Sequence, residues 1–255
     1  MEEMDDAYGI TIEQMKGIFT YCMTGSRTYK DRLYSLAPDR CPICDKRWGF
    51  NDKNLDHVLP KSKFPQFAIT PHNLVTTCDT CNKRKHDGYG KDESTGVFNA
   101  YFHEVSLAKY IKCYIYASRG DIVVNVHLIS FDESEIQDEN QYQRLKYWFE
   151  KLYDLDQMYN INVRNNILKL VDEFARSDIP EGLISEEFLR KEFQTNYDEY
   201  NKFDFSDGLI SDEFLIFIMY DSLANKSPNE LIALIKENIL ARKSEIALAK
   251  CEDIF

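Results

Sequence analysis

Two Cys-x-x-Cys pairs place the strongest constraint on what this chain can fold into. Cys41 and Cys44 form the first pair, Cys78 and Cys81 form the second, and 33 residues separate the two pairs. Four thiolates in two short knuckles are typical of a tetrahedral zinc site that leaves no open position for a substrate. Because the gap is longer than in a plain zinc ribbon, we expect a larger folded unit between the knuckles, held by a structural Zn²⁺.

Disulfides or unrelated buried thiols are the alternatives to zinc. The residues from Met1 to Asp6 show none of the basic, apolar or small-residue features of a secretory signal. We therefore expect a cytoplasmic protein whose thiols meet a reducing environment, which favours zinc over disulfides. The longest conspicuous apolar run, Phe214 to Tyr220, is far shorter than the roughly 20 residues that cross a bilayer. We expect no association with a membrane.

The segment between the knuckles is expected to form a strand, a loop, a second strand and a short helix. The first strand should end at residues 55–57, and a loop punctuated by prolines follows it. Residues 73–77 form a second run of β-favouring residues. The helix should contain Asn82, with Asp79 or Thr80 as its N-cap. The predicted order is therefore ββα.

Packing this hairpin on the helix would bring Asp56, His57 and Asn82 together. A carboxylate oxygen and an amide oxygen suit a hard cation such as Mg²⁺ or Mn²⁺, which keeps water or phosphate in the rest of its shell. A neutral imidazole beside that ion can accept the proton of an attacking water. The ion can stabilise charge on the phosphate and on the departing oxygen. The pattern predicts metal-dependent phosphodiester hydrolysis.

Residues 55–85, LDHVLPKSKFPQFAITPHNLVTTCDTCNKRK, closely resemble the HNH endonucleases, which have a ββα-metal fold with a zinc-knuckle staple. The resemblance implies that His57 is the general base and that Asp56 is a ligand of the catalytic ion. It also implies that Asn73 steadies the hairpin loop and the base. Asn82 stands where the naming pattern has histidine, a familiar variant that favours Mg²⁺ or Mn²⁺ over softer ions.

Charge is divided unevenly along the chain. Residues 1–91 contain 14 Lys and Arg against 12 Asp and Glu, whereas residues 92–255 contain 17 against 31. Only the first part favours contact with a phosphate backbone. The acidic remainder should repel DNA, so we expect a partner that supplies affinity for nucleic acid. The candidate phosphate contacts surround the predicted site: Lys61, Lys63, Lys83, Arg84 and Lys85.

The overall layout resembles, more loosely, the HNH subunits of bacterial anti-phage systems of the Septu type and their retron-linked relatives. In those systems an ATPase accompanies the nuclease. The resemblance therefore implies that this chain is the effector of an anti-phage defence complex and that its protein partner is an ATPase.

Outside the zinc-stapled unit the chain is expected to be mainly helical. A capping box at Thr11 begins a helix, and two β-rich runs around Arg119-Gly120 predict a hairpin. The repeated sequences GLISEEF and GLISDEF predict two helix starts capped by Ser185 and Ser211. We expect an α+β protein with an N-terminal helical segment (1–35), the nuclease unit (36–100) and an acidic, mainly helical accessory region (101–255).

The sequence thus predicts a metal-dependent HNH endonuclease that hydrolyses phosphodiester bonds in nucleic acid, with DNA as the favoured substrate and RNA as the alternative. Two other functions remain open. One is a non-catalytic zinc module that binds nucleic acid or protein, against which the joint presence of Asp56, His57 and Asn82 argues. The other is a stand-alone, restriction-like endonuclease, which the acidic accessory region makes less attractive.

Overall fold

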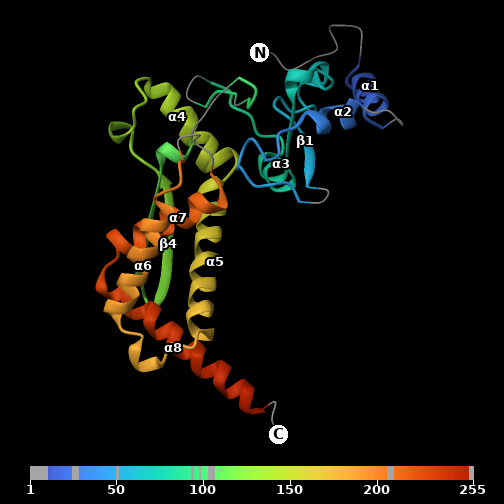
Figure 1. The fold of residues 1–255 in the computed structure, drawn as a ribbon. Helices are drawn as coiled ribbons and strands as arrows, with labels where there is room; N and C mark the ends of the chain where they lie inside the picture. Colours follow the sequence, from blue (N-terminus) through green and yellow to red (C-terminus); the bar gives the residue numbers. More distant parts are fainter. Residues whose placement is uncertain are drawn as a thin grey trace. The chain divides into compact units, whose positions relative to one another are not determined.

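The structure is a computed structural model, and it describes residues 11–24, 29–49, 52–92, 95–97, 99–102, 107–205 and 210–252. The chain divides into two compact units (Figure 1). The first unit combines Met1–Val105 with Ser130–Leu155, and the second combines Ser106–Ile129 with Asp156–Phe255. Residues 1–10, on which the expectation about a signal segment rests, lie outside the described residues.

The centre of the first unit is the predicted ββα arrangement. Strand β1 (Lys53–His57) pairs antiparallel with β2 (Leu74–Cys78), and Asp56 lies opposite Val75. Every residue of β2 is buried, as expected for a strand covered on both faces. Helix α3 (Asp79–Lys85) begins at the residue after β2 ends and packs against both strands. The predicted fold class, α+β with a ββα region and a largely helical C-terminal region, is confirmed.

The beginning of α3 differs from the prediction. Its N-cap is Cys78, whose sulfur accepts a hydrogen bond from the Cys81 amide, in place of Asp79 or Thr80. The helix ends at Lys85, because His86 adopts a left-handed conformation with φ of 46°. The capping role of Cys78 follows from its position in the knuckle, where the first turn of the helix wraps around the sulfur.

Two further helices precede the hairpin, and a helical segment follows it. Helix α1 (Ile12–Thr24) begins with the predicted capping box, in which Thr11 and Gln14 exchange hydrogen bonds, and α2 (Tyr29–Leu36) follows. The later segment contains α4 (Glu139–Tyr147) and a π-helical turn, η6 (Trp148–Leu152). Leu152 lies so close to Gly88 that a β-carbon there would come within 2.7 Å of it. Glycine at this position therefore permits the close approach.

The second unit contains the predicted β-hairpin, formed by β3 (Ile111–Ser118) and β4 (Asp121–Leu128). Arg119 and Gly120 both have positive φ angles, 52° and 80°, as a two-residue type I′ turn requires. Side chains from helices cover both open edges of this sheet. Ile115 N donates to Ser222 Oγ at 2.9 Å, and Val126 N donates to Asn160 Oδ1. Covered edges prevent pairing with strands of other molecules.

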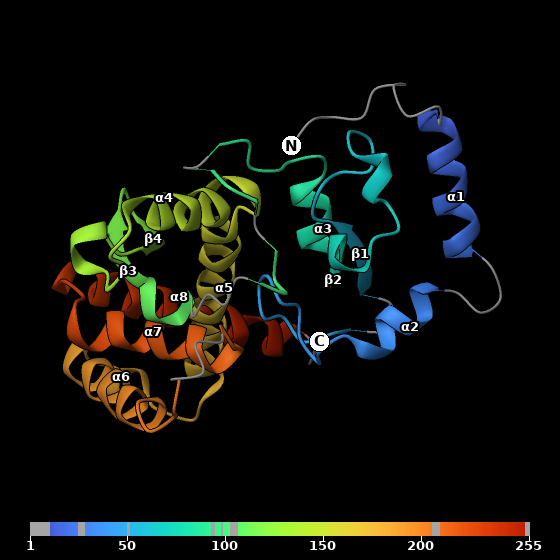
Figure 2. The same ribbon diagram turned by 90° about the horizontal axis from the view of Figure 1, so that it is seen from above.

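Four longer helices complete the second unit: α5 (Leu155–Arg176), α6 (Glu186–Tyr200), α7 (Asp212–Asn225) and α8 (Asn229–Glu252). Seen from above in Figure 2, α6 and α7 lie side by side, in agreement with their extensive contacts. Ser185 and Ser211 cap these two helices as predicted. Gly208, in the second of the repeated sequences, lies outside the described residues. Among the described helices, none combines the length and apolarity needed to cross a membrane.

Candidate active site and metal cluster

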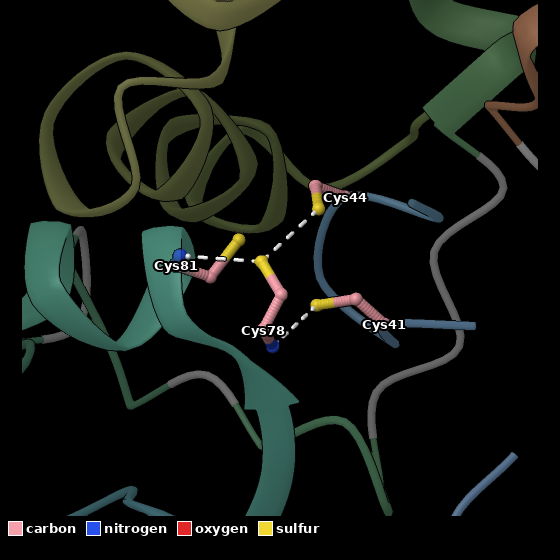
Figure 3. Close-up of side chains that lie close together, drawn as sticks. All are labelled: Cys41, Cys44, Cys78 and Cys81. Carbon is pink, nitrogen blue, oxygen red and sulfur yellow. Dashed lines mark hydrogen bonds between the residues drawn. The ribbon is translucent and has the colours of Figure 1, made fainter. Parts of the chain in front are cut away.

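The four paired cysteines meet in one buried cluster. Their sulfur atoms all lie within 4.8 Å of one another. Figure 3 shows Cys41 and Cys44 on one loop, Cys78 at the end of β2 and Cys81 in the first turn of α3. The sulfurs of Cys44 and Cys78 are 3.7 Å apart. Sulfurs bound tetrahedrally to zinc at about 2.3 Å would be separated by about 3.8 Å. The donor set and its spacing therefore fit a zinc-type cluster.

Backbone amides fix the geometry of the cluster. Cys78 N donates to the sulfur of Cys41 at 3.3 Å, and Cys81 N donates to that of Cys78 at 3.4 Å. In the first knuckle, Asp45 N donates to the carbonyl of Cys41, and Asp45 adopts a left-handed conformation. These bonds orient the sulfurs within the cluster. Among the described His, Cys, Asp and Glu residues, this cluster is the only group of three or more arranged to hold an ion.

Asp56 lies inside the domain, with only 3% of its surface exposed. Its Oδ1 accepts a hydrogen bond from Lys85 Nζ at 3.0 Å, and the same ammonium donates to the backbone carbonyl of His57 at 2.6 Å. Burial raises the pKa of the Asp56 carboxyl, whereas Lys85 acts in the opposite direction. A buried carboxylate requires a compensating cation, and Lys85 supplies it here.

His57 follows Asp56 on β1 and is half-buried. Its Nε2 lies 3.1 Å from the carbonyl oxygen of Ala68. The ring of Phe19, from α1, lies 5.0 Å from the imidazole, measured between centroids. Burial is the main cause that lowers the pKa of His57 to about 4, and the charges of Lys61 and Lys85 lower it further. The imidazole is therefore neutral at physiological pH.

Asn73 holds the loop between the strands. Its Oδ1 accepts from Leu59 N at 2.7 Å, and its Nδ2 donates to the carbonyls of Leu59 at 3.1 Å and Phe67 at 3.0 Å. The loop also contains two 3₁₀ turns, η2 (Pro65–Phe67) and η3 (Pro71–Asn73). Phe67 directly precedes Ala68, the residue whose carbonyl contacts His57. Asn73 thus ties the two parts of the loop together, and its role in orienting the base stays a prediction.

Asn82 lies on α3, three residues before Lys85, and residues at that spacing share a helical face. Because Lys85 contacts Asp56 on β1, Asn82 lies on the side of α3 that faces the hairpin. That Asp56, His57 and Asn82 come together around one ion stays a prediction.

The five basic residues do not form a single solvent-facing rim. Lys85 was expected there, yet it is only 3% exposed because it neutralises the buried Asp56. The half-buried Arg84 donates to the carbonyl and carboxylate of Asp154. The other three are surface residues. Lys61 lies 4.2 Å above the Phe19 ring, Lys63 lies 4.8 Å above the Tyr89 ring, and Lys83 pairs with Asp79.

Three features of the site were absent from the sequence prediction. One feature of the sequence indicated the pairing of Lys85 with Asp56, which is that Lys85 lies one helical turn after Asn82. The contact between Phe19 and His57 joins residues far apart in the sequence, and no local pattern indicates it. The acceptor for the imidazole is a backbone carbonyl, that of Ala68, and a carbonyl has no signature in the sequence.

Comparisons with known proteins agree with this geometry. The model of the HNH endonuclease family matches residues 41–88, which include both knuckles, the hairpin and α3. Protein ea31 of Escherichia phage lambda is 39% identical over 57 residues, which are 22% of this chain and 19% of that protein. No solved structure matches the chain significantly.

Two more distant relatives carry informative names. An HNH endonuclease predicted for retron Vc95 of Vibrio cholerae is 28% identical over 68 residues, 23% of this chain and 33% of that protein. Septu protein PtuB of Bacillus thuringiensis is 24% identical over 152 residues, 54% and 56% of the two chains. The matches thus span from a fifth to just over half of the relatives' lengths. With its buried four-cysteine cluster inside a ββα unit, this chain carries an HNH endonuclease domain and is distantly homologous to the retron and Septu proteins.

Proposed function

We propose that this protein is a metal-dependent endonuclease that hydrolyses phosphodiester bonds in nucleic acid, with His57 as the general base. The observation that carries the proposal is the state of the imidazole. Its pKa is lowered to about 4, and its Nε2 lies 3.1 Å from the Ala68 carbonyl. A general base must be unprotonated and held in one orientation, and both conditions are met.

The Ala68 carbonyl also determines which nitrogen acts. A carbonyl oxygen can only accept a hydrogen bond, so Nε2 carries the proton and donates it. Nδ1 is then left with its lone pair, which can accept a proton from water. The hydrogen bonds that Asn73 donates to the carbonyls of Leu59 and Phe67 keep the loop, and with it the Ala68 carbonyl, in place. Asn73 is in this way a positioning residue for the base.

The catalytic ion would be held by Asp56 and Asn82, with water and phosphate oxygens completing its shell. Oxygen donors of this kind suit Mg²⁺ or Mn²⁺. Asp56 lies on β1, and Asn82 lies on α3, which packs against β1. When bound, such an ion stabilises negative charge on the scissile phosphate and on the leaving oxygen. The four cysteines would hold a separate Zn²⁺ that serves the fold.

We propose that the substrate is DNA in preference to RNA. We also propose that this chain alone binds it weakly. Lys61, Lys63 and Lys83 are the basic side chains placed to meet phosphates, while Arg84 and Lys85 have internal partners. Residues 92–255 have an excess of 14 negative charges, which opposes binding to a polyanion. A partner that holds the nucleic acid would supply the missing affinity.

We propose that this partner is an ATPase and that the pair acts as an anti-phage effector. The match to Septu protein PtuB, which extends over 152 residues, and the match to the retron Vc95 protein support this proposal. The domain division into 1–35, 36–100 and 101–255 remains a prediction, as does the assignment of the accessory region to partner binding. Co-purification with the protein encoded next to this chain is the direct measurement.

A nuclease assay tests the proposed function. The zinc-loaded protein is incubated with supercoiled plasmid, single-stranded DNA and tRNA, with Mg²⁺ or Mn²⁺, in the presence and absence of the neighbouring protein. We expect metal-dependent cleavage of DNA that the partner accelerates. Complete absence of cleavage under every condition, together with metal-independent binding of nucleic acid, would instead favour a non-catalytic zinc module. Rapid specific cleavage by the chain alone would favour the restriction-like alternative.

A further inference from the structure

The carboxylate proposed as a ligand of the catalytic ion already has a cation bound to it. Lys85 Nζ lies 3.0 Å from Asp56 Oδ1 and 2.6 Å from the carbonyl oxygen of His57. The two side chains are 2% and 4% exposed. The ammonium therefore lies between two oxygen atoms, one of which belongs to the carboxylate proposed as a ligand of the ion.

We propose that Lys85 takes the place of the catalytic ion in the metal-free domain and leaves Asp56 when the ion binds. This inference rests on the proposed function, because it takes Asp56 as a ligand of that ion. It adds a role for a residue that the sequence placed among the phosphate contacts. Lys85 would lower the affinity for the ion and keep the domain folded in its absence.

Electrostatics supports an exchange of cations. An unpaired carboxylate at this depth would strongly destabilise the domain, so some cation must accompany Asp56 in every state. Lys85 provides one positive charge beside Asp56, and a divalent ion would provide two. Two cations held within a few ångströms of each other in a buried site repel strongly. The more highly charged ion is therefore expected to expel the ammonium.

Limited access to the Asp56 carboxylate is a second reason to expect that Lys85 leaves it when the ion binds. Mg²⁺ and Mn²⁺ retain several water molecules when they bind to proteins, and a carboxylate that is 4% exposed has no room for them. Something must therefore move. Asp56 is fixed on β1, which is paired along its length with β2. Lys85, by contrast, is the last residue of α3, and its side chain has four rotatable bonds.

A carboxylate has two oxygen atoms, so an alternative arrangement must be tested. Lys85 could remain on Oδ1 and support Asp56 while the ion binds Oδ2, since metal-binding carboxylates often accept such hydrogen bonds. The two arrangements predict opposite behaviour of the ammonium. Displacement exposes Lys85 to solvent when the ion binds, whereas support leaves it buried.

Covalent labelling of lysines distinguishes them in the wild-type protein. The full-length, zinc-loaded chain is treated with an amine-acetylating reagent with and without Mn²⁺, and the rates at individual lysines are read by mass spectrometry. Lys83 serves as the internal control because it lies on the same helix with 74% of its side chain exposed. We expect Mn²⁺ to accelerate the labelling of Lys85 at least tenfold and to leave that of Lys83 unchanged. Continued protection of Lys85 at saturating Mn²⁺ would overturn the proposal.

Removal of the ammonium gives an independent measurement. Lys85→Met preserves much of the side-chain length without the charge, and Lys83→Met is the matched control. Electron paramagnetic resonance of free Mn²⁺ reports the affinity of each variant. We expect Lys85→Met to bind Mn²⁺ at least tenfold more tightly than the wild type, with Lys83→Met unchanged. Equal or weaker binding by a folded Lys85→Met would show that the ammonium does not compete with the ion.

Lys85→Met leaves Asp56 without its internal partner and can therefore unfold. Thermal unfolding with and without Mn²⁺ covers this case, because the proposal requires the ion to raise the melting temperature of Lys85→Met more than that of the wild type. If the variant stays unfolded even with Mn²⁺, the labelling rates of the wild type distinguish displacement of Lys85 from its continued support of Asp56. Absence of Mn²⁺ binding to the wild type and to a folded Lys85→Met would also overturn the proposal.

The outcomes separate this inference from the proposed function. Metal-dependent cleavage by a wild-type protein whose Lys85 stays protected would retain the nuclease and reject the exchange. Release of Lys85 by Mn²⁺ in a protein that cleaves none of the three substrates would retain the exchange and reject the nuclease. His57→Ala adds a check, since it should abolish cleavage while Mn²⁺ still releases Lys85.

Discussion

The four-cysteine cluster and the Asp56 site lie in the same ββα unit, yet their proposed ligand atoms have different partners. The cluster offers four buried sulfurs within 4.8 Å of one another. Asp56 is already paired with Lys85 at 3.0 Å. We therefore expect the fold to depend on the first ion, whereas the proposed exchange gives it an internal substitute for the second.

The largest effect is expected at the cluster. Cys78→Ser removes a ligand that also caps α3, so the variant should lose its zinc and fail to fold, because binding of a structural ion and folding are coupled. Elemental analysis and circular dichroism measure the two losses. Cys113→Ser is the matched control, since Cys113 is a buried cysteine of the second unit outside the cluster. An active wild-type protein that contains no zinc would contradict the assignment.

The second prediction concerns the base. His57→Ala should lower the cleavage rate by about 100-fold or more, while zinc content and melting temperature stay close to those of the wild type. Single-turnover cleavage of plasmid measures the effect. His127→Ala is the control, because His127 stacks on Tyr114 in the second unit and has no place in the mechanism. Activity within a few-fold of the wild type would remove His57 from the reaction.

Asn73 connects fold and chemistry, so its replacement should affect both to an intermediate extent. Asn73→Ala removes three hydrogen bonds to the loop and should cost about 3 kcal/mol of unfolding free energy. Cleavage by the fraction that remains folded should also fall, because the Ala68 carbonyl loses its support. Urea unfolding and single-turnover rates measure the two effects. Asn54→Ala, which removes one bond to Asp79, should change both far less.

The smallest effect is expected at the surface lysines. Lys63→Ala should weaken binding of DNA only a few-fold and reduce the slope of its dependence on salt by about one counterion. Fluorescence anisotropy over a range of salt concentrations gives both quantities. Lys169→Ala is the control, since Lys169 is an exposed lysine of α5 that pairs with Glu173. An unchanged slope would place Lys63 outside the path of the phosphate backbone.

The sequence predicted those parts of the domain that local patterns encode. Two Cys-x-x-Cys pairs determine a cluster because their spacing is dictated by the ion, and β-favouring runs on either side of a proline-rich loop determine β1 and β2. The hairpin of the second unit was equally clear, because Arg119-Gly120 suits a turn that needs two positive φ angles. Ser185 and Ser211 likewise identified two helix starts.

Tertiary contacts decided what the sequence could not. Lys83, Arg84 and Lys85 form one basic run, and nothing local distinguishes the lysine that pairs with a buried carboxylate from the one that faces solvent. The helix cap was assigned to Asp79 or Thr80 because oxygen caps are common. Cys78 caps the helix because its sulfur is held within the cluster. The contact of Phe19 with His57 depends on how α1 packs, which periodicity alone does not reveal.

No residue separates β2 from α3, because the strand ends at Cys78 and the helix begins at Asp79. Inserting one residue after Cys81 would turn Asn82 and Lys85 by about 100° around the helix axis and point them away from β1. The loop between the strands is constrained differently, by the hydrogen bonds of Asn73 to Leu59 and Phe67 and by the contact of Ala68 with His57. Homologous domains should therefore agree to the residue from the end of β2 to the last turn of α3.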